Sequence, residues 1–145
     1  MAEAGRKDPF RVLFVCVGNA ARSQMAEGFL EKMGGERFEV SSAGLAPHWR
    51  VDPQAIVAMR AAGVDISGKE PKGLEAVDIA GQDVVVTLCQ ADDDLCPSGF
   101  KGQLRHWDIK DPHDLPMEIY RAVRDEIRRK VEGLVEEFGG RKNRG

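Results

Sequence analysis

A cysteine and an arginine near the N-terminus have the spacing of a site that binds and attacks an oxyanion. Cys16 directly follows a short apolar run, Val12–Val15, and Arg22 lies six positions further along, beside Ser23. A loop between a strand and a helix can direct its N–H groups at a tetrahedral anion, and an arginine can hold two of the anion's oxygens. The same positive field stabilises a thiolate. The pattern therefore predicts a nucleophilic Cys16, although a cysteine taken alone is more often buried and inert.

The residues between Cys16 and Ser23 suit such a loop. Gly18 and Asn19 tolerate backbone angles that most residues avoid, and Ser23 begins a helical pattern. We expect the anion to be bound by the backbone of six consecutive residues and by the arginine side chain: Val17, Gly18, Asn19, Ala20, Ala21 and Arg22.

Strands and helices alternate along the chain in an order typical of α/β folds. Strands are predicted at Val12–Val15, Phe38–Ser42, Asp83–Leu88 and Leu104–Ile109, and helices at 23–33, 53–62, Leu74–Ile79 and Met117–Phe138. This order predicts a four-stranded parallel sheet with helices on both faces. We expect a single domain over residues 1–145, with a structured core from about residue 11 to residue 138.

Three chemical groups come directly after predicted strands. In open parallel sheets, ligands bind beyond the carboxyl ends of the strands. Cys16, Cys89 and Asp111 each occupy such a position, so we expect them at one edge of the sheet. Asp111 is the candidate general acid, because a carboxylic acid facing the anion can protonate a leaving oxygen. The alternative is ordinary turn chemistry, since Asp111 precedes Pro112.

The two remaining cysteines, Cys89 and Cys96, allow two interpretations. In a continuous helix their Cα atoms would lie about 10 Å apart, whereas a disulfide allows at most roughly 7 Å. A bond between them would need a looped segment, for which Gly99, Gly102 and the repelling run Asp92–Asp94 leave room. Otherwise Cys89 packs beneath the strand end and Cys96 is an incidental surface thiol. The spacing does not suit zinc, and we predict neither a metal nor a cofactor.

Composition narrows the class of protein. The chain has 145 residues, of which 42% are hydrophobic and 31% charged, as in soluble globular proteins. A net charge of −3 without a basic stripe indicates no nucleic acid, and no apolar run is long enough to span a membrane. The N-terminal basic residues imitate a secretory signal, but cleavage would remove a core strand. Three cysteines favour a reducing compartment, so we expect a cytoplasmic protein. We also expect a monomer.

At the level of motifs the chain resembles a known family. Its segment CVGNAARSQMAEG, from Cys16 to Gly28, is similar to the active-site loop of thioredoxin-coupled arsenate reductases, which share the fold of the low-molecular-weight protein tyrosine phosphatases. The resemblance extends from about Arg11 to Phe138, and paired downstream cysteines separate the reductases from simple phosphatases. Further motifs match in order: Ser42-Ala43-Gly44, Thr87-Leu88-Cys89 with Cys96-Pro97, His106-Trp107 and Asp111-Pro112.

The resemblance implies a relay of thiols that reduces arsenate to arsenite. Cys16 would attack arsenate held by the loop amides and Arg22, while Asp111 protonates the departing oxygen. Cys89 would then attack Cys16 and release arsenite. Cys96 would attack Cys89, and thioredoxin would reduce the resulting Cys89–Cys96 disulfide.

The resemblance also implies supporting roles around the loop. Ser23 would hydrogen-bond to the thiolate, and Asn19 would brace the loop. Some reductases bind a monovalent cation near the positions of Asn19, Glu27 and Ser42. The segment 68–72, which would complete that site, contains two lysines here, and we expect a lysine to supply the positive charge instead.

Two other functions stay open at this point. A phosphatase would use Cys16, Arg22 and Asp111 to hydrolyse phosphate monoesters, with the other thiols passive. A non-catalytic protein would bind arsenite through the three thiols. The loop that holds His48, Trp49 and Arg50 is predicted to reach the rim of the pocket, with internal packing as the alternative for Trp49. His106 and Trp107 are predicted to be structural.

Overall fold

The structure, a computed structural model, describes residues 8–89 and 95–139. The acidic run Asp92–Asp94, part of the segment for which a loop was considered, therefore lies outside the described residues. No helix in the described part is long and apolar enough to cross a membrane. Strands and helices follow in the order β1 (Phe10–Cys16), α2 (Arg22–Gly34), η1 (Gly35–Arg37), β2 (Phe38–Gly44), α3 (Pro53–Ala61), η2 (Leu74–Ala76), β3 (Val84–Thr87), β4 (Gln103–His106) and α4 (Met117–Phe138), where η marks a single 3-10 turn.

The four strands form one parallel sheet in the order β2-β1-β3-β4, which confirms the predicted sheet. β1 lies in the middle and pairs with both neighbours, so that Val15 faces Ala43 on one side and Thr87 on the other. Val12–Val15 is fully buried, as expected for a continuous apolar run in a strand covered on both faces.

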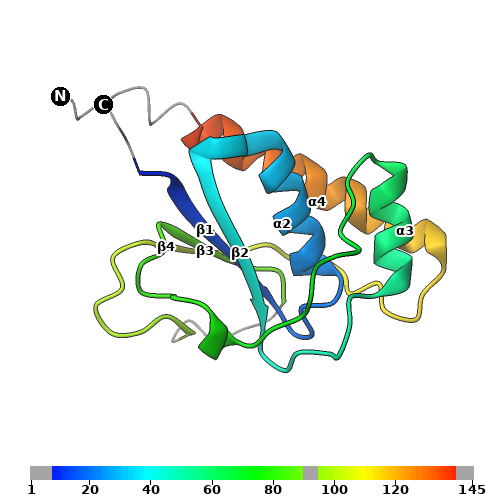
Figure 1. Cartoon of the computed structure of the whole chain (residues 1–145), viewed down its shortest axis with the longest axis horizontal. Helices are drawn as coiled ribbons and strands as arrows, with labels where there is room; N and C mark the ends of the chain where they lie inside the picture. The colour runs from blue at the N-terminus through cyan, green and yellow to red at the C-terminus, as the bar shows by residue number, and fades with distance from the viewer. Residues whose placement is uncertain (1–7, 90–94, 140–145) are drawn as a thin grey trace.

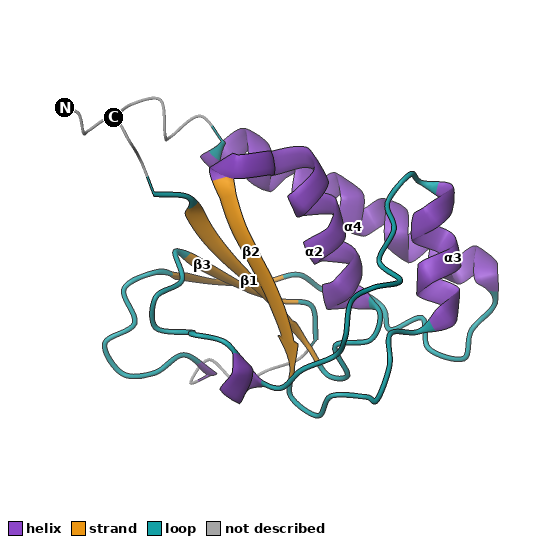
Figure 2. Ribbon diagram, in the orientation of Figure 1, coloured by secondary structure: helices purple, strands orange, loops and turns teal. Residues whose placement is uncertain are grey.

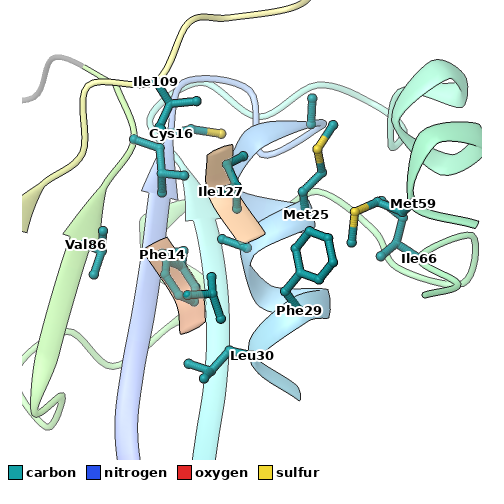
Figure 3. Packing of buried hydrophobic residues seen from close by; sticks show 14 of the residues in the cluster. Phe14, Cys16, Met25, Phe29, Leu30, Met59, Ile66, Val86, Ile109 and Ile127 are labelled. Carbon is teal, nitrogen blue, oxygen red and sulfur yellow. The ribbon is translucent and has the colours of Figure 1, made fainter. Parts of the chain in front are cut away.

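The α-helices cover one face of this sheet (Figures 1 and 2). Val12 and Phe14 belong to a large apolar cluster with α2, α3 and α4. Figure 3 shows Phe14 packed there with residues of the three helices. Leu13 and Val15 point into a smaller cluster on the opposite face. In the described part of the chain, that face is covered by loops and by η2.

The helical layer predicted on this second face is therefore limited to one turn. Leu74–Ile79 was expected to be a short helix, but η2 ends at Ala76 and Val77 is extended, with φ −128° and ψ 154°. An extended backbone allows both Val77 and Ile79 to reach the smaller cluster. An apolar pattern this short does not distinguish the two conformations.

The other helices begin and end close to the residues that the sequence predicts. Asp52 caps α3, because its Oδ1 accepts the N–H of Gln54 at 2.9 Å, and Pro53 occupies the first turn. The predicted apolar stripe of α4 is buried throughout: Tyr120, Val123, Ile127, Val131, Leu134 and Phe138. The last strand is shorter than predicted. β4 ends at His106, and the chain then leaves the sheet towards the end of β1 and β3.

Replacing Ile127 by Ala should lower the free energy of unfolding by about 2–5 kcal/mol, because it opens a cavity beneath the sheet. Ile127 has no exposed surface. Urea denaturation would measure the change. Glu132→Ala, on the exposed side of α4, is the control and should stay within about 0.5 kcal/mol of the parent. Similar losses for the two variants would contradict the packing described here.

Candidate active site

The loop after β1 is held by a second loop, residues 45–52, that runs beside it. Because a trans peptide places its N–H opposite its C=O, a carbonyl bonded to the second loop turns the next N–H the other way. Together with the unpaired N–H groups of the first turn of α2, these N–H groups can bind an anion. Four N–H groups bond the carbonyls in order: Leu45 to Cys16 (3.0 Å), Ala46 to Val17 (2.8 Å), His48 to Gly18 (2.9 Å) and Asp52 to Ala20 (2.8 Å).

Gly44 permits the two loops to approach. A β-carbon at this position would lie 2.6 Å from the carbonyl oxygen of Val17 and 2.9 Å from the nitrogen of Asn19. Both atoms belong to the backbone, so no side-chain rotation could relieve the clash. The glycine at the end of β2 is therefore required by the shape of the loop.

Asn19 fixes the loop from within. It adopts a left-handed backbone conformation, with φ 51°, and it is completely buried. Its Oδ1 accepts hydrogen bonds from Gln24 Nε2 (3.1 Å) and from the N–H of Lys72 (2.9 Å). Its Nδ2 donates to Ser23 Oγ (2.7 Å) and to Ser42 Oγ (3.0 Å). These four bonds brace the loop in the way that the resemblance implies.

Cys16 lies at the C-terminal end of β1, at the edge of the large apolar cluster (Figure 3). Its Sγ is 2.9 Å from Ser23 Oγ on the first turn of α2. The serine is therefore placed to donate its hydroxyl proton to a thiolate.

Arg22 is oriented by the ends of the two strands beyond β1. Its Nη1 donates to the carbonyls of Leu88 (2.7 Å) and Ile109 (3.1 Å), and its side chain is buried. Its Nη2 lies 3.6 Å from Asp111 Oδ2. Asp111 itself is half exposed and its Oδ1 accepts the N–H of His113 at 3.1 Å. The Arg22 guanidinium and the candidate acid Asp111 therefore line the same space.

A pocket of about 100 Å³ opens between these groups. Five of the six residues predicted to bind the anion line it, and Asn19 stands behind the wall as a brace. His48 lines it from the loop that was predicted to reach the rim. Two further lining residues, Asp52 and His113, were not predicted from the sequence as members of the site.

Asp52 links the pocket to α4. Beyond capping α3, it accepts the hydroxyl of Tyr120 through Oδ2 at 2.5 Å, and His113 Nδ1 lies 3.9 Å from the same oxygen. Burial, together with the hydrogen bond to Asp52, raises the pKa of Tyr120, so the hydroxyl stays a donor. Tyr120 occupies an apolar position of a helical stripe, which gives no sign of this contact.

The cysteines Cys89 and Cys96 lie on opposite faces of the sheet. Cys89 packs against the large cluster, which also contains Cys16, and Cys96 packs against the smaller one. All three cysteines are free thiols. Burial, followed by the nearby Cys16, raises the pKa of Cys89 against an opposing effect of Arg22, and burial raises that of Cys96.

Other predicted residues do not line this pocket itself. Trp49 does not pack internally: it is 83% exposed, with the Arg50 guanidinium 4.5 Å from its ring centre. It lines an adjoining hollow that shares His48 with the pocket. His106 bonds to Thr87 Oγ1 at 2.5 Å, and Trp107 packs against Phe14, so both serve the sheet as predicted. The expected lysine is Lys69, which lies beside Glu27.

Residues 11–144 match the family of low molecular weight phosphotyrosine protein phosphatases. The chain belongs to this family, and the nucleophile loop and its fold are those of the class.

Its relatives within the family include reductases. The chain is 37% identical to the glutaredoxin arsenate reductase of a Synechocystis strain, over 86% of this chain and 95% of the relative. It is 38% identical to arsenate reductase 2 of Staphylococcus haemolyticus, over 88% and 97%. A solved arsenate reductase in the phosphate-binding state superposes with a TM-score of 0.81 at 36% identity, covering 89% of this chain and 98% of the other.

At about pH 6, Cys16 should react with iodoacetamide faster than the other thiols, because it lines the pocket with the loop residues and its Sγ lies 2.9 Å from Ser23 Oγ, which can donate to a thiolate. The pKa values of Cys89 and Cys96 are raised, mainly by burial, so these thiols should react appreciably only at higher pH. Peptide mapping by mass spectrometry between about pH 5 and pH 10 would give all three rates. A Cys16 no more reactive than Cys96 at about pH 6 would contradict the proposed anion-binding loop.

Proposed function

We propose that this protein reduces arsenate to arsenite with its own thiols and that thioredoxin restores them. The observation that carries the proposal is a second thiol, Cys89, which packs against the apolar cluster that contains Cys16 and directly follows Leu88, whose carbonyl accepts a hydrogen bond from Arg22. Hydrolysis of a phosphate ester needs only the first thiol. The relatives named as arsenate reductases support the same reaction.

The first step joins arsenic to Cys16. The thiolate attacks arsenate bound by the loop amides and by Arg22, and an oxygen leaves as water after Asp111 supplies a proton. The half-exposed carboxyl of Asp111 suits this role, because solvent can restore its proton.

The second step transfers two electrons. Cys89 attacks Cys16 Sγ, the bond between sulfur and arsenic breaks, and its electron pair stays on arsenic, which leaves as arsenite. A Cys16–Cys89 disulfide remains. Cys89 packs against the cluster that contains Cys16, so the two thiols lie on the same face of the sheet, and Cys89 must approach Cys16 for this step.

The third step needs a larger rearrangement. Cys96 must leave the smaller cluster on the opposite face before it can attack Cys89 and release the Cys16 thiolate. The Cys89–Cys96 disulfide that results is the substrate for thioredoxin. A protein that depends on three reduced thiols in this way suits the cytoplasm.

A second candidate function is hydrolysis of phosphate monoesters, which the family favours. Cys16, Arg22 and Asp111 would suffice for it, and the pocket that they line would hold phosphate in the same way as the similar arsenate ion. The two functions differ in their need for Cys89.

Replacing Cys89 by Ser should reduce multiple-turnover reduction of arsenate with thioredoxin to background, because no thiol then reaches Cys16. Hydrolysis of p-nitrophenyl phosphate by the same variant should remain within about threefold of the parent, since the first step does not use Cys89. Coupled consumption of NADPH through thioredoxin reductase measures the first activity, and release of p-nitrophenol measures the second.

Cys96→Ser is the matched control in this experiment. It should complete one turnover and stop as a Cys16–Cys89 disulfide, visible in non-reduced peptides. Equal loss of both activities in a folded Cys89→Ser protein would show that Cys89 is structural, and unchanged arsenate turnover would exclude the relay.

A further inference from the structure

The pocket is lined by negative as well as positive groups. Asp52 and Asp111 both line it together with Arg22. The Asp52 side chain is only 10% exposed, and both of its oxygens accept hydrogen bonds, Oδ1 from the N–H of Gln54 and Oδ2 from the hydroxyl of Tyr120. A carboxylate in this place repels a bound oxyanion, and limited access of water weakens the screening of that repulsion. A positive charge beside Asp52 would therefore strengthen binding of the anion.

His113 lies where such a charge would act. It belongs to the turn that leads into α4, which lies beside the start of α3 (Figure 1), and it lines the same pocket. Its Nδ1 lies 3.9 Å from Asp52 Oδ2, and its Nε2 lies 3.4 Å from Asp114 Oδ2. A neutral imidazole carries a proton on one of its two nitrogens, whereas the imidazolium carries one on each. Only the imidazolium can therefore donate a proton to both carboxylates at once.

The candidate acid holds this histidine at the pocket. Asp111 Oδ1 accepts the N–H of His113 at 3.1 Å, and Asp114, the next residue, has a left-handed backbone with φ 63°. The turn therefore presents the imidazole beside the carboxyl of Asp111. The His113 side chain is 54% exposed, so its ring can exchange a proton with solvent.

We propose that His113 is an anion-binding residue of the pocket: its imidazolium offsets the charge of Asp52, so that the oxyanion binds more tightly when His113 is protonated. Histidine is the side chain that ordinarily changes its charge between about pH 5 and pH 8, so the affinity of the pocket should change within this range. The proposal goes beyond the proposed function and does not depend on it, because reduction and hydrolysis both begin with a bound oxyanion.

Other groups near His113 must be separated from it in a test. Besides Asp52, the charged and titratable groups around it are Cys16, Arg22, His48, Arg50, Asp111 and Asp114. Carboxylates and guanidinium groups ordinarily keep their charge between about pH 5.5 and pH 8. Burial and the bond to Asp52 raise the pKa of Tyr120, so its hydroxyl stays neutral. The thiol of Cys16 and the imidazole of His48 are therefore the two groups to control.

The test measures binding of sulfate, which is a dianion throughout this range, to a protein carrying Cys16→Ser. The serine removes the titrating thiol. Isothermal titration calorimetry at constant ionic strength gives the dissociation constant at about pH 5.5 and pH 8, and we expect sulfate to bind about fivefold more tightly at the lower pH. His113→Gln should bind with the weaker affinity at both pH values, and His113→Arg, whose charge is permanent, with the tighter affinity at both. A folded His113→Gln protein that keeps the full pH dependence would overturn the proposal.

The matched control removes the other imidazole of the pocket. The ring of His48 lies 5.7 Å from that of His113, centre to centre, and packs against Gly18, where a β-carbon would lie 2.7 Å from its Cδ2. His48→Gln should keep most of the pH dependence, because the proposal assigns the effect to the imidazole beside Asp52. A loss of the dependence in His48→Gln that equals or exceeds the loss in His113→Gln would contradict this assignment.

A second measurement needs no substitution at His113. Because binding and protonation are linked, bound sulfate must favour the protonated imidazole by the same factor by which protonation favours sulfate. In the Cys16→Ser protein, saturating sulfate should raise the midpoint of the His113 titration, followed by NMR, by about 0.7 pH unit, which corresponds to fivefold. A histidine with a purely structural role would not respond, so a midpoint that stays unchanged with sulfate bound would overturn the proposal.

Discussion

The whole site depends on the orientation of a few peptide groups in the loop after β1. The carbonyls of Cys16, Val17, Gly18 and Ala20 bond to a neighbouring loop, so the N–H groups that follow them point the other way, where they can bind an anion. Several distant features serve this one arrangement. The parallel pairing of β1 with β2 sets Cys16 opposite Gly44 and so brings the two loops together. The absence of a side chain at Gly44 lets the two loops touch. Asn19 is the residue of the loop with a left-handed backbone, and its side-chain hydrogen bonds hold the loop in place.

Arg22 connects the loop to the segments that follow the neighbouring strands β3 and β4. One of its nitrogens bonds the carbonyl of Leu88, which directly precedes Cys89, and the carbonyl of Ile109, which lies two residues before Asp111. The guanidinium that lines the pocket therefore also positions the segments that carry Cys89 and Asp111. Because these groups share a single guanidinium, the ends of β1 and β3 and the segment after β4 behave as one site.

Much of this was predictable, because it is encoded by neighbours in the sequence. The buried strand before Cys16, the cap at Asp52 and the stripe of α4 follow from local patterns of apolar and capping residues. The approach of Cys16, Cys89 and Asp111 followed from parallel topology, since the carboxyl ends of such strands share an edge.

Contacts between residues far apart in the sequence were not predictable in the same way. Tyr120 reads as an ordinary core residue of α4, and only the packing of α4 beside α3 brings its hydroxyl to Asp52. A lysine was expected near Glu27, but the sequence did not show which of two would reach it or that Glu31 would share it. The extended path after η2 and the early end of β4 likewise depend on tertiary contacts rather than on local propensity.

The central claim is that the electrons for arsenate come from the protein's own thiols. The most direct measurement is a single turnover: reduced protein is mixed with one equivalent of arsenate without thioredoxin, and free thiols and arsenite are counted. The relay of thiols should form one arsenite per protein and lower the number of free thiols from three to one, with Cys89 and Cys96 joined and Cys16 free. Three thiols remaining with no arsenite formed would contradict it, and would leave a phosphatase or an arsenite-binding protein in its place.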